Sequence, residues 1–482
     1  MIVLGYLLAL FAGAGVLRLV AGTRPHRAYG WAGAAALSVL AGGAVVALVT
    51  TVVAVLGWST RPWPFVAPML ALVGLALALP DRIRSAERPG PRTWPGDLLA
   101  GGLGLAVGVR LALATAHLTV ASNDEYAIWM VRARTLSLAG RLDPAVFLGA
   151  RASYQHLDYP LLVPAVAAWG DGWARHASDA AAHVALSVTL GAALAVAGWA
   201  LLRLAGAAAA VAGMLLLAAT PQLLAPAALL LTADATVFAF AVSAALVMAV
   251  WVRDGGRAPL GAAAVLAAGA AQTKVEGMLF AAAVLVGAAV AVKSGRRRAL
   301  VPVAAGVVAT VFPWLAWTRL HGLPSDVLNG ATLAPGHLIR TLPLAGEVGR
   351  QMAAYWPGFG WGFLLALAPA GWLAWRAGQG RLTAYVGVTL ALVALGLYAQ
   401  YLVGAAPPWA RGAAAFPSLR LHFASTGHRV LLVPAALASV GVPLLAGSAL
   451  RRTVPGTADG AAGAGPTLAG QPRGTRRNES LT

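Results

Sequence analysis

The sequence contains no cysteine and few charged residues for its length. Of its 482 residues, 11% are Asp, Glu, Lys or Arg, whereas soluble domains carry about a quarter. The absence of cysteine excludes a disulfide framework and a thiolate metal site. The low charge, with 59% hydrophobic residues and a mean hydropathy of +0.76, excludes an ordinary soluble protein.

Acidic residues are especially scarce. The chain has 16 acidic and 35 basic side chains, giving a net charge of +19. A nucleic-acid-binding protein would gather its basic residues in one stripe or arm, but here they are scattered through short segments between hydrophobic runs. We therefore expect no nucleic-acid partner and attribute the basic excess to membrane topology.

Hydrophobic runs of around twenty residues recur along most of the chain, each long enough to cross a hydrocarbon core of roughly 30 Å. They predict an all-α, polytopic transmembrane helical bundle of about thirteen spans. Two of the predicted spans, 63–80 and 258–272, are short enough to be tilted or re-entrant. The predicted spans are 2–22, 29–57, 63–80, 97–119, 179–202, 205–220, 226–252, 258–272, 276–293, 299–318, 359–375, 382–404 and 430–449.

Lys and Arg alternate in density between successive loops. By our count one set of loops holds 20 basic and 6 acidic residues and the other 13 basic and 10 acidic, with Arg18 and Arg110 inside spans. The positive-inside rule makes the first set cytoplasmic. We therefore expect a multi-pass plasma-membrane protein with its N-terminus outside and its C-terminus in the cytoplasm, and three long external segments near 120–178, 319–358 and 405–429.

The densest polar segment is 123–134, which begins with Asn123, Asp124 and Glu125. At α-helical spacing Tyr126, Trp129 and Ala133 share one face, with Arg132 apart from them, which predicts an amphipathic helix at the membrane interface with its acidic residues in the first turn. A purely structural interpretation is that the acidic residues favour the helix dipole and the aromatic residues belong to the interfacial belt.

Four further segments carry ionisable groups on the predicted outer face. In the first, His156, Asp158 and Tyr159 precede Pro160, which could open a helix through Trp169. Singly, these groups are ordinary loop residues.

Asp234 and the pair Lys274 and Glu276 lie at or within predicted spans. Asp234 falls about eight residues inside the span 226–252, where a charged group is costly unless it is paired or hydrated. Lys274 and Glu276 stand at an outer boundary and could simply pair with each other. A structural role for each of these groups remains open.

The segment before the last predicted span contains His422, Ser425 and Arg429. If it is helical, these three side chains share one face, and the Arg429 guanidinium could bind a phosphate in two places. Arg429 could equally be a snorkelling anchor. The charge count did not use these outer-face groups to assign sides, so their gathering on one side favours a common function.

Taken together, these segments resemble the polytopic GT-C glycosyltransferases, in particular bacterial relatives of the protein O-mannosyltransferases and of the lipid A aminoarabinose transferases. The resemblance covers residues 97–450, which it makes the GT-C-like catalytic core, with 1–96 as extra N-terminal transmembrane helices. The remaining residues, 451–482, are rich in Gly, Ala, Thr and Pro, and we expect them to form a disordered cytoplasmic tail. Two departures stand out: about three spans precede the acidic loop, and Val275 and Arg132-Ala133-Arg134 replace residues that relatives often carry as Asn and Lys.

The resemblance implies an inverting sugar transfer from a polyprenyl-phosphate carrier to a glycan, lipid or protein acceptor on the extracytoplasmic face. It implies Asp124 as the base, with Glu125 beside it. A carboxylate at a membrane boundary can hold the raised pKa that a base needs, and nearby cations stabilise a leaving phosphate. The remaining expected groups are, for donor binding, Lys274, Glu276, Arg429, His422, Ser425 and Arg132, and elsewhere in the site Trp129, Arg134, His156, Asp158, Tyr159 and Asp234.

No cofactor is required by the sequence, although Asp124, Glu125 and Asp158 could hold a divalent cation. The main alternative function is a transporter or flippase for a polyprenyl-linked or sugar substrate, which would place ionisable groups near the membrane midplane. A scaffold whose outer loops bind a partner would leave Asp234 and the acidic loop without a purpose.

Overall fold

The computed structural model describes residues 1–79, 94–119, 125–142, 156–219, 232–323, 334–356, 358–404 and 429–453, together with Gly427. Within these ranges the chain is helical and has no strand. The first part contains α1 (Ile2–Ala21), α2 (Pro25–Val55), α3 (Trp63–Ala78), α4 (Trp94–Thr115), η1 (Glu125–Met130), α5 (Val131–Arg134), η2 (Thr135–Ala139), α7 (Leu162–Ala174), α8 (Asp179–Ala205) and α9 (Ala207–Ala218).

The second part contains the helices that form the centre and one side of the bundle. They are α12 (Ala233–Asp254), α13 (Arg257–Ala271), α14 (Val275–Ala291), α15 (Ser294–Arg297), α16 (Leu300–Leu320), α17 (Pro335–Thr341), η3 (Leu342–Leu344), α18 (Ala345–Tyr355), α19 (Gly358–Arg376), α20 (Gly380–Gly404) and α22 (Leu432–Thr453).

The all-helical, membrane-embedded architecture is as the hydrophobic runs predict. Each of the thirteen expected segments coincides with a helix. In the described ranges, eight helical segments are long and apolar enough to cross a bilayer, while α3, α9, α13 and α14 are shorter apolar helices. The number of true spans therefore stays a prediction.

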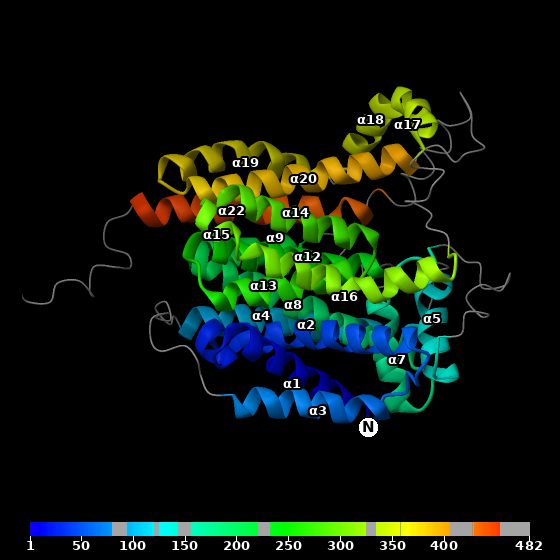
Figure 1. The fold of residues 1–482 in the computed structure, drawn as a ribbon. Helices are drawn as coiled ribbons and strands as arrows, with labels where there is room; N and C mark the ends of the chain where they lie inside the picture. Colours follow the sequence, from blue (N-terminus) through cyan, green and yellow to red (C-terminus); the bar gives the residue numbers. More distant parts are fainter. Residues whose placement is uncertain are drawn as a thin grey trace, which may run out of the picture.

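The long helices run side by side, and the short helices α5, α7, α17 and α18 gather at one end (Figure 1). The end that carries α5, α7, α17 and α18 lies to the right in that view, and the C-terminal end of α22 lies at the opposite end, with α15. We call these the loop end and the arginine end of the bundle. Two of the three segments expected to be external, 120–178 and 319–358, thus supply the short helices of the same end.

Helix α12 occupies the centre of the bundle. Its most apolar stretch is entirely buried, and the helix packs against α8, α13, α14, α20 and α22. Asp234 lies in its first turn and Asp254 at its last residue. At 1.5 Å per residue these two carboxylates are about 30 Å apart, which places one at each end of the bundle.

Small residues let neighbouring helices approach closely. Between α4 and α8, a Cβ added to Gly104 would lie 2.6 Å from the carbonyl oxygen of Gly191, and one added to Gly191 would meet Gly104 in the same way. Packing of this kind drives helix association in lipid, where the hydrophobic effect between helices is absent.

The expected span 226–252 was placed too early. Helix α12 begins at Ala233, and residues 220–231 lie outside the described ranges. Asp234 is consequently a first-turn residue and not a group deep inside a span. Hydropathy alone missed this start because the residues before Ala233 are as apolar as those after it.

Candidate functional site

The centre of the candidate site is a buried ion pair between two helices at the loop end. Lys274 Nζ donates to Asp234 Oδ1 at 2.6 Å, with only 7% and 8% of the two side chains exposed. Lys274 lies just before α14, and Asp234 opens α12. The expected pairing of Lys274 with Glu276 is present, with Nζ 3.6 Å from Oε1, but Asp234 is the nearer partner of Lys274.

Two more charged groups and one amide complete this ion cluster. Arg429 Nε lies 3.8 Å from Asp234 Oδ2. Gln400 of α20 donates through Nε2 to Glu276 Oε1 at 3.1 Å, while Glu276 Oε2 is buried without a hydrogen-bond partner among the described residues. The cluster of Asp234, Lys274, Glu276, Arg429 and Gln400 thus combines two carboxylates, two cations and one amide in a largely buried environment.

The local electrostatics keep Lys274 charged. Burial by itself would lower the pKa of Lys274, but the carboxylates of Asp234 and Glu276 outweigh that effect and hold the pKa above its ordinary value. The side chain therefore remains a fixed cation at neutral pH.

Helix polarity explains the position of the acids but not that of the cations. Asp234 and Glu276 lie in the first turns of α12 and α14, where the helix dipole favours negative charge. Lys274 and Arg429 also precede helices, where the dipole disfavours positive charge. Their positions are tolerated because buried carboxylates lie beside them, and this arrangement is unusual for groups with a purely structural role.

The helix expected in 123–134 is present from Glu125 onward, but its faces differ from the prediction. Trp129, Arg132 and Ala133 are buried, whereas Tyr126 is 48% exposed. The reason is that Glu125–Met130 and Thr135–Ala139 are π-helical. Hydrogen bonds from residue i to i+5 lengthen the turn, so α-helical spacing gives the wrong faces.

Arg132 fastens this helix to the segment that follows it. Its Nη1 donates to the Tyr159 carbonyl oxygen at 3.1 Å, and its Nη2 donates to the His156 carbonyl oxygen. The His156 ring stacks on Tyr159 with centroids 4.4 Å apart, and Tyr159 stacks on Trp129 at 5.7 Å. A guanidinium bound to two carbonyls and a three-ring stack therefore order this loop.

The ordered loop lies against the turn that carries the ion cluster. The Leu162 amide donates to the Gln272 carbonyl oxygen at 3.0 Å. One apolar cluster includes Trp129 and Tyr159 from the loop together with Ala233, and Val275 packs against it. Since Ala233 precedes Asp234 and Val275 separates Lys274 from Glu276, residues 125–142, 156–162, 233–234 and 274–276 form one site.

Other expected residues lie at its edge. The Asp158 carbonyl oxygen accepts from Trp314 Nε1 at 2.7 Å. Arg134 pairs with Asp179 at 3.0 Å, and its guanidinium lies over the Tyr126 ring. Glu125 is buried at the start of η1, with 1% of its surface exposed.

Three expected site residues, Asp124, His422 and Ser425, lie outside the described residues. The metal proposal depends on one of them, because Asp124 was to act with Glu125 and Asp158. Within the described ranges no group of three His, Asp or Glu side chains is arranged to hold an ion.

Sequence reasoning missed Gln400 and Trp314. Gln400 is a strongly polar side chain inside the apolar run of α20, and a polar group inside a span is a usable signal of function. Trp314 gave no comparable signal, because tryptophan is common near membrane interfaces.

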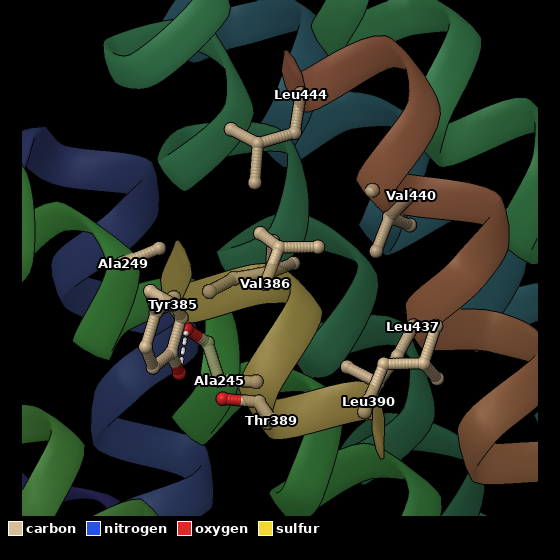
Figure 2. Close-up of a pocket in the computed structure, with 11 residues that line it drawn as sticks. Ala245, Ala249, Tyr385, Val386, Thr389, Leu390, Leu437, Val440 and Leu444 are labelled. Carbon is tan, nitrogen blue, oxygen red and sulfur yellow. Dashed lines mark hydrogen bonds between the residues drawn. The ribbon is translucent and has the colours of Figure 1, made fainter. Parts of the chain in front are cut away.

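An apolar recess opens between α12, α20 and α22 (Figure 2). It holds about 320 Å³ of space, its open mouth included. Among the residues drawn around it are Ala245, Tyr385 and Val440, and the Tyr385 hydroxyl donates to the Ala245 carbonyl oxygen at 2.8 Å. The recess lies along the same two helices, α12 and α22, whose beginnings contribute to the ion cluster.

Comparison of the chain with protein-family models, with curated proteins and with solved structures found no match.

Proposed function

We propose that the protein is a GT-C-type membrane glycosyltransferase, which takes a sugar from a polyprenyl-phosphate carrier on the extracytoplasmic face and transfers it with inversion. The observation that carries this proposal is the contact between the aromatic external loop and the buried ion cluster. A sugar could lie against the aromatic rings while the carrier phosphate approaches the cations.

The roles follow from the chemistry of the transfer. The acceptor hydroxyl oxygen attacks the anomeric carbon, the bond from that carbon to the phosphate oxygen breaks, and the oxygen leaves with the electron pair. Asp124 takes the acceptor proton. Lys274 and Arg429 stabilise the charge that develops on the carrier phosphate.

The structure changes the assignment of two other residues. Arg132 already binds two carbonyl oxygens, so we assign it to ordering the loop and no longer to the donor phosphate. Asp234 holds Lys274 in place, and we assign it to positioning that cation. Both are consequently positioning residues and not catalytic ones.

The apolar recess offers a place for part of the carrier chain. Ala245 lies eleven residues after Asp234 on α12, which is about 16 Å along the helix axis. A prenyl chain whose phosphate lay near Lys274 would pass this depth. The recess is lined almost wholly by apolar side chains, which suits a hydrocarbon.

The proposal is tested with purified protein and a panel of polyprenyl-phosphate sugars, with released carrier phosphate measured by mass spectrometry. Wild-type protein should release carrier from at least one donor, and Asp124→Asn should lose the activity while remaining folded in the membrane. Asp179→Asn is the matched control, because it removes another carboxylate, one that pairs with Arg134; it should keep most of the activity.

Two outcomes would contradict the proposal at different levels. Full activity in Asp124→Asn would remove the assignment of the base. No release from any donor, together with movement of an intact lipid-linked sugar in proteoliposomes, would establish the alternative, a flippase or transporter. The first-turn position of Asp234 argues against that alternative, because transporters place such groups near the midplane.

A further inference from the structure

The arginine end of the bundle contains two kinds of basic residue. One kind is bound within the protein: Arg203 and Arg253 pair with Asp254 at 2.9 and 2.6 Å, and Arg253 also donates to the carbonyl oxygens of Leu204 and Arg203. These arginines bind the ends of α8 and α12 and neutralise Asp254.

The other kind is exposed and has no such partner. It includes five basic side chains from two connections, and within the described ranges none of these five forms an ion pair with a carboxylate. The sequence has no Asp or Glu at 292–300 or at 375–382. The five are Lys293, Arg297 and Arg298 in the connection from α14 to α16, and Arg376 and Arg381 in the connection from α19 to α20.

The two connections lie close together. Helices α14 and α20 pack against each other, and the end of α14 is at the same level as the start of α20. Arg381 is near enough to Arg296 to repel it electrostatically. Mutual repulsion among so many cations is unfavourable unless an anion lies between them.

The surroundings of this patch indicate what that anion is. Trp372 and Trp375 are exposed on the last turns of α19, at 57% and 62%, and the Arg376 guanidinium lies 5.0 Å from the centre of the Trp372 ring. Exposed tryptophan beside basic residues is typical of the level of the lipid headgroups. Guanidinium groups bind phosphate through two parallel hydrogen bonds.

We propose that Lys293, Arg297, Arg298, Arg376 and Arg381 form a binding site for the headgroup of an anionic phospholipid. Its phosphate is held between the α14–α16 and α19–α20 connections, and Trp372 and Trp375 lie beside its glycerol and upper acyl chains. Basic pockets between transmembrane helices recognise lipids in this manner. The inference does not depend on the proposed glycosyltransferase activity.

The test is native mass spectrometry of the detergent-purified full chain, titrated with phosphatidylglycerol and with phosphatidylcholine of the same acyl chains. Wild-type protein should bind phosphatidylglycerol more tightly. Arg297→Gln with Arg381→Gln should weaken this binding by about 30-fold, since one basic group at such a surface contributes roughly five-fold. Binding of phosphatidylcholine should not change.

A matched control removes two exposed arginines from the loop end, Arg319→Gln with Arg340→Gln. This pair should leave phosphatidylglycerol binding within about two-fold of wild type. Equal affinity of the wild type for the two lipids, or equal loss in the two double variants, would overturn the proposal. Either result would be expected if the basic patch instead binds an acidic protein partner, or if it attracts anionic lipids only through its overall positive charge.

Discussion

The two ends of the bundle use charge in opposite ways. At the arginine end, α8 and α12 finish, and Arg253 and Arg296 donate to the carbonyl oxygens of their last turns, as the helix dipole favours. At the loop end, α14 and α22 begin, and Lys274 and Arg429 lie where the dipoles of these two helices oppose them. A cation at the C-terminal end of a helix is stabilised by the dipole, so its position needs no functional explanation. A cation at the N-terminal end of a helix, held there by buried carboxylates, needs one.

The two ends also differ in how much free energy is lost when one partner of an ion pair is removed. Arg253 and Asp254 are partly exposed, so their pairing contributes little free energy. Lys274 and Asp234 are buried, and removing one partner would leave an uncompensated charge. The loop end is thus sensitive to single substitutions and the arginine end tolerant of them.

The largest expected effect is that of Lys274→Met. We expect the free energy of unfolding to fall by about 3–5 kcal/mol, because Asp234 is left buried without its cation. The double variant Asp234→Asn with Lys274→Gln should recover part of that loss without recovering sugar transfer. Denaturant titration in detergent measures the first quantity and the donor-release assay the second; a double variant less stable than Lys274→Met would contradict the ion-pair argument.

A smaller effect is expected for Arg132→Gln. Glutamine cannot reach both carbonyl oxygens that Arg132 binds, so the free energy of unfolding should fall by about 1–3 kcal/mol. The aromatic stack should loosen, and limited proteolysis should cut faster within 125–160. Tyr126→Ala, a change at an exposed ring of the same helix, is the control; equal protease sensitivity in both variants would refute the assignment of Arg132 to ordering the loop.

The smallest effect is expected at the arginine end, for Arg253→Gln. The variant loses an ion pair and two bonds to carbonyl oxygens, but partial exposure should limit the change to about 1–2 kcal/mol. Sugar transfer should stay within about two-fold of wild type. A strong loss of sugar transfer in a variant that still folds would contradict the assignment of Arg253 to a purely structural role at the arginine end.

Part of the site could be predicted from the sequence because topology restricts where charges go. Lys274, Asp234 and Arg429 were assigned to one face by counting basic residues in alternate loops, and the structure brings these three together. Sequence separation did not matter, because a helix that spans the bundle fixes the side on which each connection emerges.

Other parts could not be predicted, for identifiable reasons. The faces of residues 125–139 depend on π-helical turns that packing selects and propensity does not. Gln400 reaches Glu276 only because α20 lies against α14, and hydropathy does not specify which apolar helices are neighbours. The start of α12 likewise lies within a uniformly apolar stretch.

The sequence by itself determined that this is an all-helical membrane protein with its polar groups gathered by side, because burial of backbone polar groups in lipid permits little else. Only the tertiary structure decided which charges meet. Lys274 lies 2.6 Å from Asp234 but 3.6 Å from Glu276, although Glu276 is nearer in sequence. This choice of partner follows from the packing of α12 against α14. Side-chain geometry between helices is a property of that packing and not of the pattern along either helix.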